Sequence, residues 1–306
     1  MPRRVEFLSK GITVVGELHL PADSAPDRKH AAVVVAHPMG GVKEQTASLH
    51  AKLLAENGFV ALAFDAAYQG ESGGEPRGLE DPFQRAEDVR SAVTYLSTLE
   101  EVDPERIGAL GICASGGYVP FAAQTDVRIK AVATLSAVDV GGLFREGLKN
   151  TDMVTDRAAL FKMLQEAGKA RIAEARGEPV PMQPLIPENP EGLPDTVPTL
   201  FREGHDYYRT PRAQHCRSTN RFPVRSMDLI MNYSSYAFND LISPRPLLMI
   251  AGSEADSLYF SEEAIARAKE PKELYVVKGQ THISLYDHVD GHLPKLVDFF
   301  AKSLSQ

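Results

Sequence analysis

The sequence predicts an α/β protein with a mostly parallel, doubly wound sheet, and three observations lead to this prediction. Short apolar runs rich in β-branched residues alternate with helical patterns along most of the 306 residues. Each run is apolar at successive positions, as in strands that are covered on both faces. Strands that alternate with helices are joined by right-handed crossovers, which place helices on both sides of a parallel sheet.

The chain is expected to begin with a β-hairpin, because residues 5–8 and 12–20 alternate apolar and polar around Lys10-Gly11. Six buried strands are expected after it, at residues 31–36, 59–64, 106–112, 129–136, 246–251 and 273–277. Five helices are expected between and after these strands, at residues 46–57, 82–99, 118–123, 261–268 and 293–304. The first of these helices has leucines at helical spacing and stops at Gly58, which is a typical helix end.

Residues 141–243 break this alternation, and we call them the insertion. Residues 155–175 are typical of a helix, residues 178–198 are rich in proline, and residues 205–225 are dense in Tyr, Arg, His and Asn. Connections this long inside a compact domain usually carry a function. We therefore expect a mainly helical cap over an α/β core formed by residues 1–140 and 244–306. The alternative is an irregular connection.

Composition limits the possible partners and location. The chain is 43% hydrophobic and has a formal net charge of −8, which argues against nucleic acid as a partner. No apolar run approaches the length of a membrane span, and no signal peptide is visible. Two cysteines make no disulfide framework. We expect a cytoplasmic protein without a cofactor or metal, with a small-molecule substrate; a homodimer is compatible with the sequence.

The stretch Gly108 to Gly117 matches a nucleophile elbow. A strand ends there in the pattern small-x-nucleophile-x-small, with Cys113 at the centre and Gly111 and Ser115 at the small positions. A buried cysteine at a strand end can also be a small core residue. A phosphate-binding loop is excluded because Gly117 stands where its lysine would be, and no dinucleotide fingerprint fits these glycines.

Four loops at the carboxyl ends of the predicted strands carry suitable chemistry. The loop 37–41 offers glycines and backbone amides, and the elbow offers the amide of Ala114. The loop 251–257 offers Asp256, and the loop 278–282 offers His282. Nucleophile, acid and histidine thus follow in the order found in α/β-hydrolases.

Asp139 and Glu254 are rivals of Asp256 for the acid, because both follow predicted strands. His37 begins its loop and is better suited to order it than to act as a base. His288 and His292 lack the third ligand and the glutamate of a zinc site.

The chain resembles the α/β-hydrolases, and within them the branch related to dienelactone hydrolase. That branch carries G-x-C-x-[GS]-G at the elbow, matched here by Gly111, Cys113, Ser115 and Gly116. Dienelactone hydrolases proper are shorter and lack a cap of this size, so their lactone substrate is not carried over. The length and the segment 205–211 are closer to capped hydrolases, some relatives of which transfer polyketide acyl groups.

These residues predict a hydrolase of activated esters, thioesters or lactones with a Cys113–His282–Asp256 triad and an acyl-cysteine intermediate. The amides of Met39 and Ala114 are expected to form the oxyanion hole. The residues expected to contact substrate are His37, Gly40, Tyr207, Tyr208 and Arg209. An acyltransferase that uses an alcohol or amine acceptor is the alternative, and a non-catalytic binding protein is a third reading.

Overall fold

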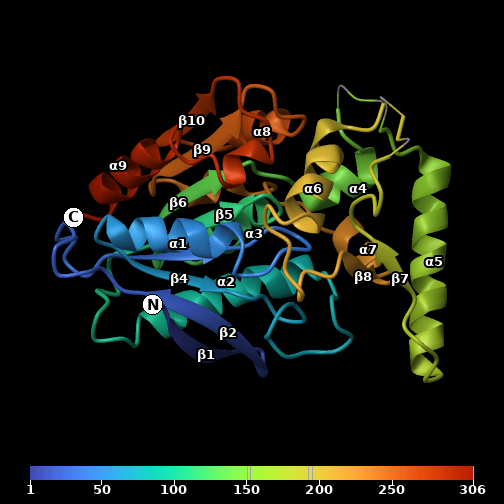
Figure 1. The fold of residues 1–306 in the computed structure, drawn as a ribbon, viewed down its shortest axis with the longest axis horizontal. Coiled ribbons are helices and arrows are strands. Elements are labelled where there is room, and N and C mark those ends of the chain that lie inside the picture. Colours follow the sequence, from blue (N-terminus) through green and yellow to red (C-terminus); the bar gives the residue numbers. More distant parts are fainter. Residues whose placement is uncertain (150, 152, 192, 195, 306) are drawn as a thin grey trace.

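The core of the molecule is an eight-stranded sheet, seen in the computed structural model (Figure 1), which describes residues 1–149, 151, 153–191, 193–194 and 196–305. Its strands are β1 (Arg3–Ser9), β2 (Ile12–His19), β3 (Ala32–Ala36), β4 (Val60–Phe64), β5 (Ile107–Ile112), β6 (Ile129–Leu135), β9 (Leu247–Gly252) and β10 (Lys272–Val277). They are ordered β1-β2-β4-β3-β5-β6-β9-β10. In this sheet β1–β2 and β2–β4 pair antiparallel and the other five pairs are parallel, so the predicted fold class is confirmed.

The hairpin of β1 and β2 turns at Lys10 and Gly11, where the backbone is left-handed. Their φ values are 45° and 80°, and Ser9 pairs with Ile12. A two-residue turn with two positive φ values matches the twist of the flanking strands. The expected alternation is present, since Val5, Phe7 and Ser9 are buried while their neighbours are exposed.

Helices cover both faces of the sheet. The helices of the core are α1 (Thr46–Glu56), α2 (Pro82–Leu96), α3 (Ser115–Ala123), α8 (Leu258–Arg267) and α9 (Leu293–Ser303). Helix α2 packs against α3, whereas α1 and α9 lie together on the other face (Figure 1). Each begins and ends within a few residues of its predicted position.

A buried pair of histidines joins α1 to the start of α9. The Nε2 atoms of His50 and His292 are 3.0 Å apart, and His50 Nδ1 donates to the carbonyl of Thr46 at 2.9 Å. Burial lowers the pKa of His50 to about 4 and that of His292 to about 3, so the pair is neutral near pH 7.

The insertion contributes a separate group of small elements beside the sheet (Figure 1). Between β6 and β9 the chain forms α4 (Val140–Glu146), α5 (Arg157–Ala175), β7 (Met182–Pro184), α6 (Thr199–Arg209), β8 (Arg221–Pro223), α7 (Ser226–Met231) and the 3-10 helix η1 (Asn239–Ile242). Helix α5 matches the predicted helix at 155–175. The short pair β7–β8 and the helix α6 arise in stretches where the sequence showed no clear periodicity.

The end of the insertion packs directly on the elbow helix α3. Tyr236 donates its hydroxyl to the carbonyl of Gly116 at 3.1 Å, and Gln124 donates to the carbonyl of Ser235 at 2.8 Å. This last part of the insertion is therefore tied to the core rather than standing above it.

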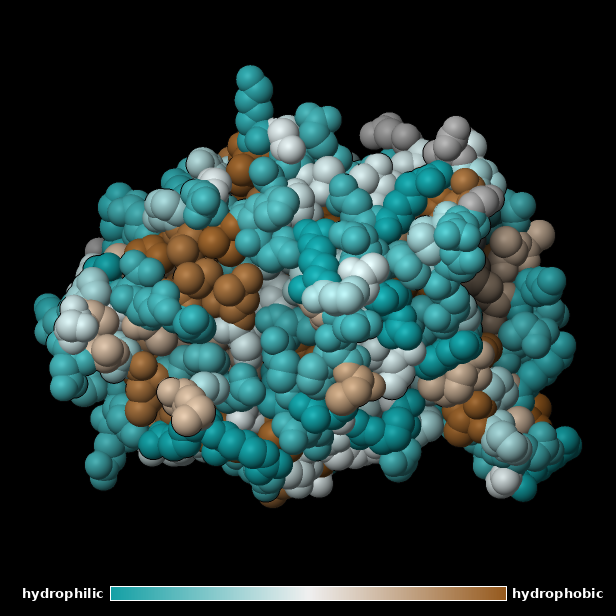
Figure 2. Space-filling model, viewed as in Figure 1, coloured by the Kyte–Doolittle hydropathy of each residue, from teal (hydrophilic) through white to brown (hydrophobic). Residues whose placement is uncertain are grey.

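The face of the molecule in Figure 2 is mostly hydrophilic, with hydrophobic residues in small patches. Such scattered apolar patches are usual on a globular surface. Among the described residues, none of the helices has both the length and the apolar character needed to cross a bilayer.

Candidate active site

The nucleophile elbow is present at Cys113, which has a positive φ of 56° between β5 and α3. Its amide donates to the carbonyl of Leu135 at 3.0 Å, and its carbonyl accepts from Gly116 at 2.8 Å. A Cβ on Gly111 would lie 1.9 Å from the carbonyl oxygen of Ser115, so only glycine fits where strand and helix cross. The left-handed backbone is a local strain of the kind found at functional residues.

Ser115 faces inward and holds the elbow to the neighbouring loop. Its hydroxyl is buried and donates to the carbonyl of His37 at 2.6 Å. The side chain is committed to this bond, which agrees with its predicted role as a small structural residue and not as the nucleophile.

The loop after β3 and the start of α3 bring Met39 and Ala114, whose amides are the predicted oxyanion donors, to the same cavity as Cys113. Within the described residues, neither the amide of Met39 nor that of Ala114 donates to a backbone carbonyl. Gly40 has a φ of 73°, which turns the loop back across the elbow. The Ala114 amide contacts the Cys113 thiol, and amides placed there are suited to bind the charge of a tetrahedral intermediate.

His37 is buried beneath this loop and holds it through hydrogen bonds. It is therefore not exposed to substrate, contrary to the prediction that it contacts substrate. It is buried, with Nδ1 2.7 Å from the carbonyl of Pro38 and Nε2 within 2.9 Å of Arg85 and 3.1 Å of the amide of Ala66. Burial and the charge of Arg85 hold its pKa well below the usual range. Arg85 pairs in turn with buried Glu80 at 3.1 Å.

His282, the predicted catalytic base, is linked to Cys113 through the hydroxyl of Tyr286. His282 is buried, and its Nε2 lies 3.1 Å from the hydroxyl of Tyr286, which also interacts with the Cys113 thiol. Tyr286 belongs to the short 3-10 helix η2 (Ser284–Tyr286). Among the described residues, no hydrogen bond joins Cys113 directly to His282, whereas Tyr286 contacts both.

The partner of His282 on its other nitrogen is Ser257, not the predicted Asp256. Ser257 Oγ lies 2.6 Å from Nδ1. Asp256 instead accepts from the amide of Leu200 at 2.9 Å, at the start of α6. The reason is local: the turn after β9 directs Ser257 inward and Asp256 toward the insertion.

The two rival acids are also engaged elsewhere. Asp139 accepts from the amide and hydroxyl of Ser235, at 3.2 and 2.9 Å. Glu254 accepts from Ser253 at 3.1 Å on an exposed loop. In this structure, therefore, neither of them orients His282.

Burial keeps both Cys113 and His282 uncharged near pH 7. Burial raises the pKa of the Cys113 thiol to about 11, against the smaller lowering effects of its contacts with Tyr286 and the Ala114 amide. Burial lowers the pKa of His282 to about 3. A reaction at Cys113 would therefore begin from a thiol and a neutral imidazole.

A small apolar cavity of about 60 Å³ opens at Cys113. It is lined by Met39, Cys113, Ala114, Val138, Val140, Leu143, Leu185, Ile186, Leu200, Phe201, Gly204, Tyr208, Ile283 and Tyr286. Both core and insertion contribute to this wall. The cavity thus joins the elbow, the oxyanion amides and the tyrosine hydroxyl in one water-poor space.

Of the residues predicted to contact substrate, Tyr208 lines this cavity, and the others make structural contacts around it. Tyr207 is buried edge-on against Tyr286, with ring centroids 5.1 Å apart, and Arg212 lies over its other side. Arg209 donates to the carbonyl of Ser218 at 3.0 Å, and the carbonyl of Gly40 accepts from Ser218 at 2.6 Å. Tyr207, Arg209 and Gly40 are therefore parts of the scaffold around the cavity.

Comparison with known proteins agrees with this geometry. The model of the dienelactone hydrolase family matches residues 18–138. The chain is 38% identical to YcjY of Escherichia coli, over 99% of this chain and 100% of that protein. It is 39% identical to PA2218 of Pseudomonas aeruginosa, over 99% and 81% of the two chains. The chain belongs to the dienelactone-hydrolase-related branch of the α/β-hydrolases. The crystal structure of PA2218 matches it with a TM-score of 0.91, at 38% identity over 99% of this chain and 94% of that one.

Two further relatives carry an activity in their names. The thiohydrolase aneE of Aspergillus aculeatus is 33% identical over 60% of this chain and 54% of that protein. The polyketide transferase grgF of Penicillium is 26% identical over 100% and 98%. The crystal structure of GrgF has the same fold, with a TM-score of 0.82 at 23% identity over 100% of both chains.

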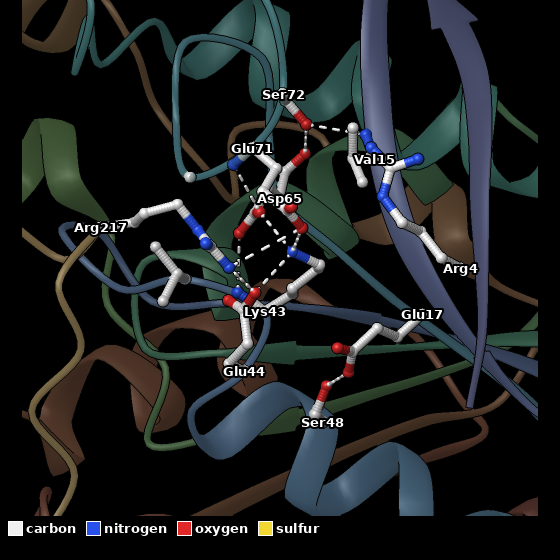
Figure 3. Close-up of polar contacts among 12 residues, drawn as sticks. Arg4, Val15, Glu17, Lys43, Glu44, Ser48, Asp65, Glu71, Ser72 and Arg217 are labelled. Atoms are coloured by element: carbon white, nitrogen blue, oxygen red, sulfur yellow. Dashed lines mark hydrogen bonds and ion pairs between the residues drawn. The ribbon is translucent and has the colours of Figure 1, made fainter. Parts of the chain in front are cut away.

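A cluster of charges lies behind the oxyanion loop of this hydrolase (Figure 3). Lys43 Nζ contacts Glu44, Asp65 and Glu71 at 2.7, 2.9 and 2.5 Å, and Arg217 of the insertion pairs with Glu44. Burial alone would lower the pKa of Lys43, but the carboxylate of Asp65 and the bonds to Glu44 and Glu71 raise it. The three carboxylates are close enough to hold a cation, and the ammonium group already occupies that position.

Tyr286 and Ser257 are the site residues that sequence reasoning missed. Tyr286 follows His282 by four residues, the spacing that brings side chains together in one helical turn. Ser257 directly follows Asp256, the predicted acid, so a shift of one residue in the loop places Ser257 and not Asp256 beside His282. Neither position belongs to the motif, and only the folded loop identifies them.

Proposed function

We propose that this protein hydrolyses activated acyl compounds, thioesters or aryl esters, through an acyl-Cys113 intermediate. The observation that carries the proposal is Cys113 itself, strained at the elbow and facing an apolar cavity beside two amides that donate to no backbone carbonyl of the described residues. Thiolate leaves readily from a tetrahedral intermediate, so a cysteine nucleophile favours substrates with a good leaving group. The name of the relative aneE, a thiohydrolase, supports the same class.

The first half-reaction begins from neutral groups. Cys113 Sγ attacks the carbonyl carbon as its proton passes to the Tyr286 oxygen, and the Tyr286 proton passes to His282 Nε2. The amides of Met39 and Ala114 hold the oxyanion, a donor being worth about 3 kcal/mol. The carbon–sulfur or carbon–oxygen bond to the leaving group breaks, and His282 returns the proton to that group.

The second half-reaction regenerates the enzyme. Water attacks the acyl-Cys113 thioester, one of its protons goes to the Tyr286–His282 pair, and the bond to Sγ breaks as the proton returns to the thiol. Ser257 accepts from Nδ1–H of His282 and fixes the tautomer in which Nε2 is free to take a proton. Asp256 would complete a triad only if it released the amide of Leu200.

Acyl transfer is the second candidate, supported by the full-length similarity to the polyketide transferase grgF and by the apolar cavity, which disfavours water. In that case an alcohol or amine replaces water in the second half-reaction.

A panel of p-nitrophenyl esters and acyl thioesters, assayed with wild type and Cys113→Ala, tests the proposal. We expect a burst of leaving group equal to the enzyme concentration and its loss in Cys113→Ala. Partitioning of the acyl group between water and added alcohols then separates hydrolysis from transfer. Full activity in Cys113→Ala would reject the acyl-cysteine route.

A further inference from the structure

Two cavities meet at a wall of four apolar side chains near the active site. The inner cavity contains Cys113 and has a volume of about 60 Å³, and a larger pocket of about 530 Å³ lies outside it. The side chains that line both are Leu143, Leu185, Ile186 and Phe201. The outer pocket is completed by Phe144, Met153, Pro184, Pro187, Thr196, Val197 and Pro198.

The volumes show that the inner cavity cannot hold a substrate alone. Ligand sites usually measure about 300–1,000 Å³. The inner cavity is far below this range, while the outer pocket lies within it. A substrate with its carbonyl at Cys113 therefore needs space beyond the inner cavity, and the outer pocket is adjacent to it.

The chemistry of the outer pocket selects a hydrocarbon. Among the described residues that line it, none is charged, and only Thr196 carries a polar side chain. A charged or strongly polar group placed there would lose its hydration without gaining a partner. An aliphatic chain, in contrast, gains from each methylene that it buries.

One side of the wall is rigidly held. Asn220 accepts from the amides of Leu185 and Ile186 at 3.2 and 2.9 Å and donates to the carbonyl of Ile186 at 2.9 Å. Leu185 also lies against Gly40, whose Cβ would be 2.7 Å from it. The other side is formed by Leu143 on α4 and Phe201 on α6, whose side chains are held by packing alone.

We propose that the outer pocket binds the aliphatic tail of the acyl group, which passes between Leu143, Leu185, Ile186 and Phe201 to reach Cys113. The proposal rests on the proposed function and makes it more specific: the substrates are acyl thioesters or aryl esters with chains longer than butanoyl. Each methylene that enters the pocket tightens binding about fourfold, since it contributes about 0.8 kcal/mol.

The test compares butanoyl, octanoyl and dodecanoyl thioesters with wild type, Val197→Asp and Val127→Asp. Val197 lines only the outer pocket, and Val127 is an exposed valine outside both cavities. For wild type we expect kcat/KM to rise on the order of a hundredfold from butanoyl to octanoyl. Val197→Asp should lower kcat/KM for the longer chains about tenfold or more and leave butanoyl unchanged, while Val127→Asp should change neither.

A binding measurement separates this proposal from the proposed function. Cys113→Ala is titrated by calorimetry with non-hydrolysable butanoyl and dodecanoyl thioethers, with and without Val197→Asp. Tighter binding of dodecanoyl that Val197→Asp abolishes supports the tail pocket even if no ester is turned over. Equal affinity for both chains, or no effect of Val197→Asp on either assay, overturns it while leaving burst kinetics on short esters intact.

Discussion

Removing one hydroxyl, in Tyr286→Phe, tests how the proton leaves the nucleophile. The hydroxyl of Tyr286 contacts both His282 and the Cys113 thiol, and no proton passes through a phenyl ring. If this hydroxyl is the relay, its loss removes general-base assistance, which is worth about 10²–10⁴ in rate. We therefore expect kcat/KM for a thioester to fall by at least about a hundredfold.

The protonation state of Cys113 allows a second effect of Tyr286→Phe to be calculated, the change in the rate of cysteine alkylation. With a pKa of about 11, about one Cys113 in a thousand is a thiolate at pH 8. A hydrogen bond to a charged group is worth about 1.5–3 kcal/mol, or about one to two pKa units. Alkylation of Cys113 by iodoacetamide at pH 8 should therefore slow about tenfold or more in Tyr286→Phe. In wild type, the rate of Cys113 alkylation should rise tenfold for each pH unit.

The control is Tyr275→Phe, which removes a hydroxyl at the exposed edge of the sheet. Both variants are checked for unchanged thermal unfolding. If Tyr286→Phe retains activity within about threefold of wild type, or alkylates faster than wild type, then Cys113 engages His282 directly and the relay is wrong.

Three other outcomes follow from the geometry. Ser257→Ala should lower kcat about tenfold or more, because the tautomer of His282 is then no longer fixed. Asp256→Asn keeps an oxygen that can accept from the amide of Leu200, and it should change kcat less than about threefold. A larger loss of kcat in Asp256→Asn would restore Asp256 as the acid. Ser115→Ala should keep kcat within about tenfold and keep Cys113 labelling by iodoacetamide, and loss of labelling would mean that the elbow register is wrong. The folded pKa values of His50 and His292 lie below those of the unfolded chain, so their contribution to stability is complete above about pH 6.5 and is lost as the pH falls toward 4. Between pH 7 and pH 5, the free energy of unfolding measured in urea should fall by about 2 kcal/mol less for His292→Gln than for wild type. An identical fall for both proteins would show that the pair is protonated in the native state.

Much of the fold was predictable because local patterns agree with the sheet. The runs at 31–36 and 107–112 are apolar at every position since both faces of these strands are covered, and burial of every residue in β3 and β5 follows. The elbow was predictable because the crossing of strand and helix dictates a glycine at position 111, two residues before Cys113. A motif of this kind records a steric requirement that any sequence with the fold must meet.

The partners of His282 were not predictable, because they depend on loop conformation. Asp256 and Ser257 are adjacent and both can accept a hydrogen bond, and only the turn after β9 decides which one faces the histidine. The insertion was equally difficult to predict: β7 and β8 have three residues each and pair across 36 intervening positions. Pairing at that separation leaves no periodic trace in either segment.

The contacts of residues 213–218 with the oxyanion loop limit how this enzyme can be re-engineered. Gln45 donates to the carbonyl of Ala213, Arg217 pairs with Glu44, and Ser218 donates to the carbonyl of Gly40. A chimaera that exchanges the whole insertion for that of a relative would leave a buried lysine cluster and the oxyanion loop without these partners. Transplants of substrate preference should therefore keep residues 213–218 as part of the recipient and exchange only the chain before them.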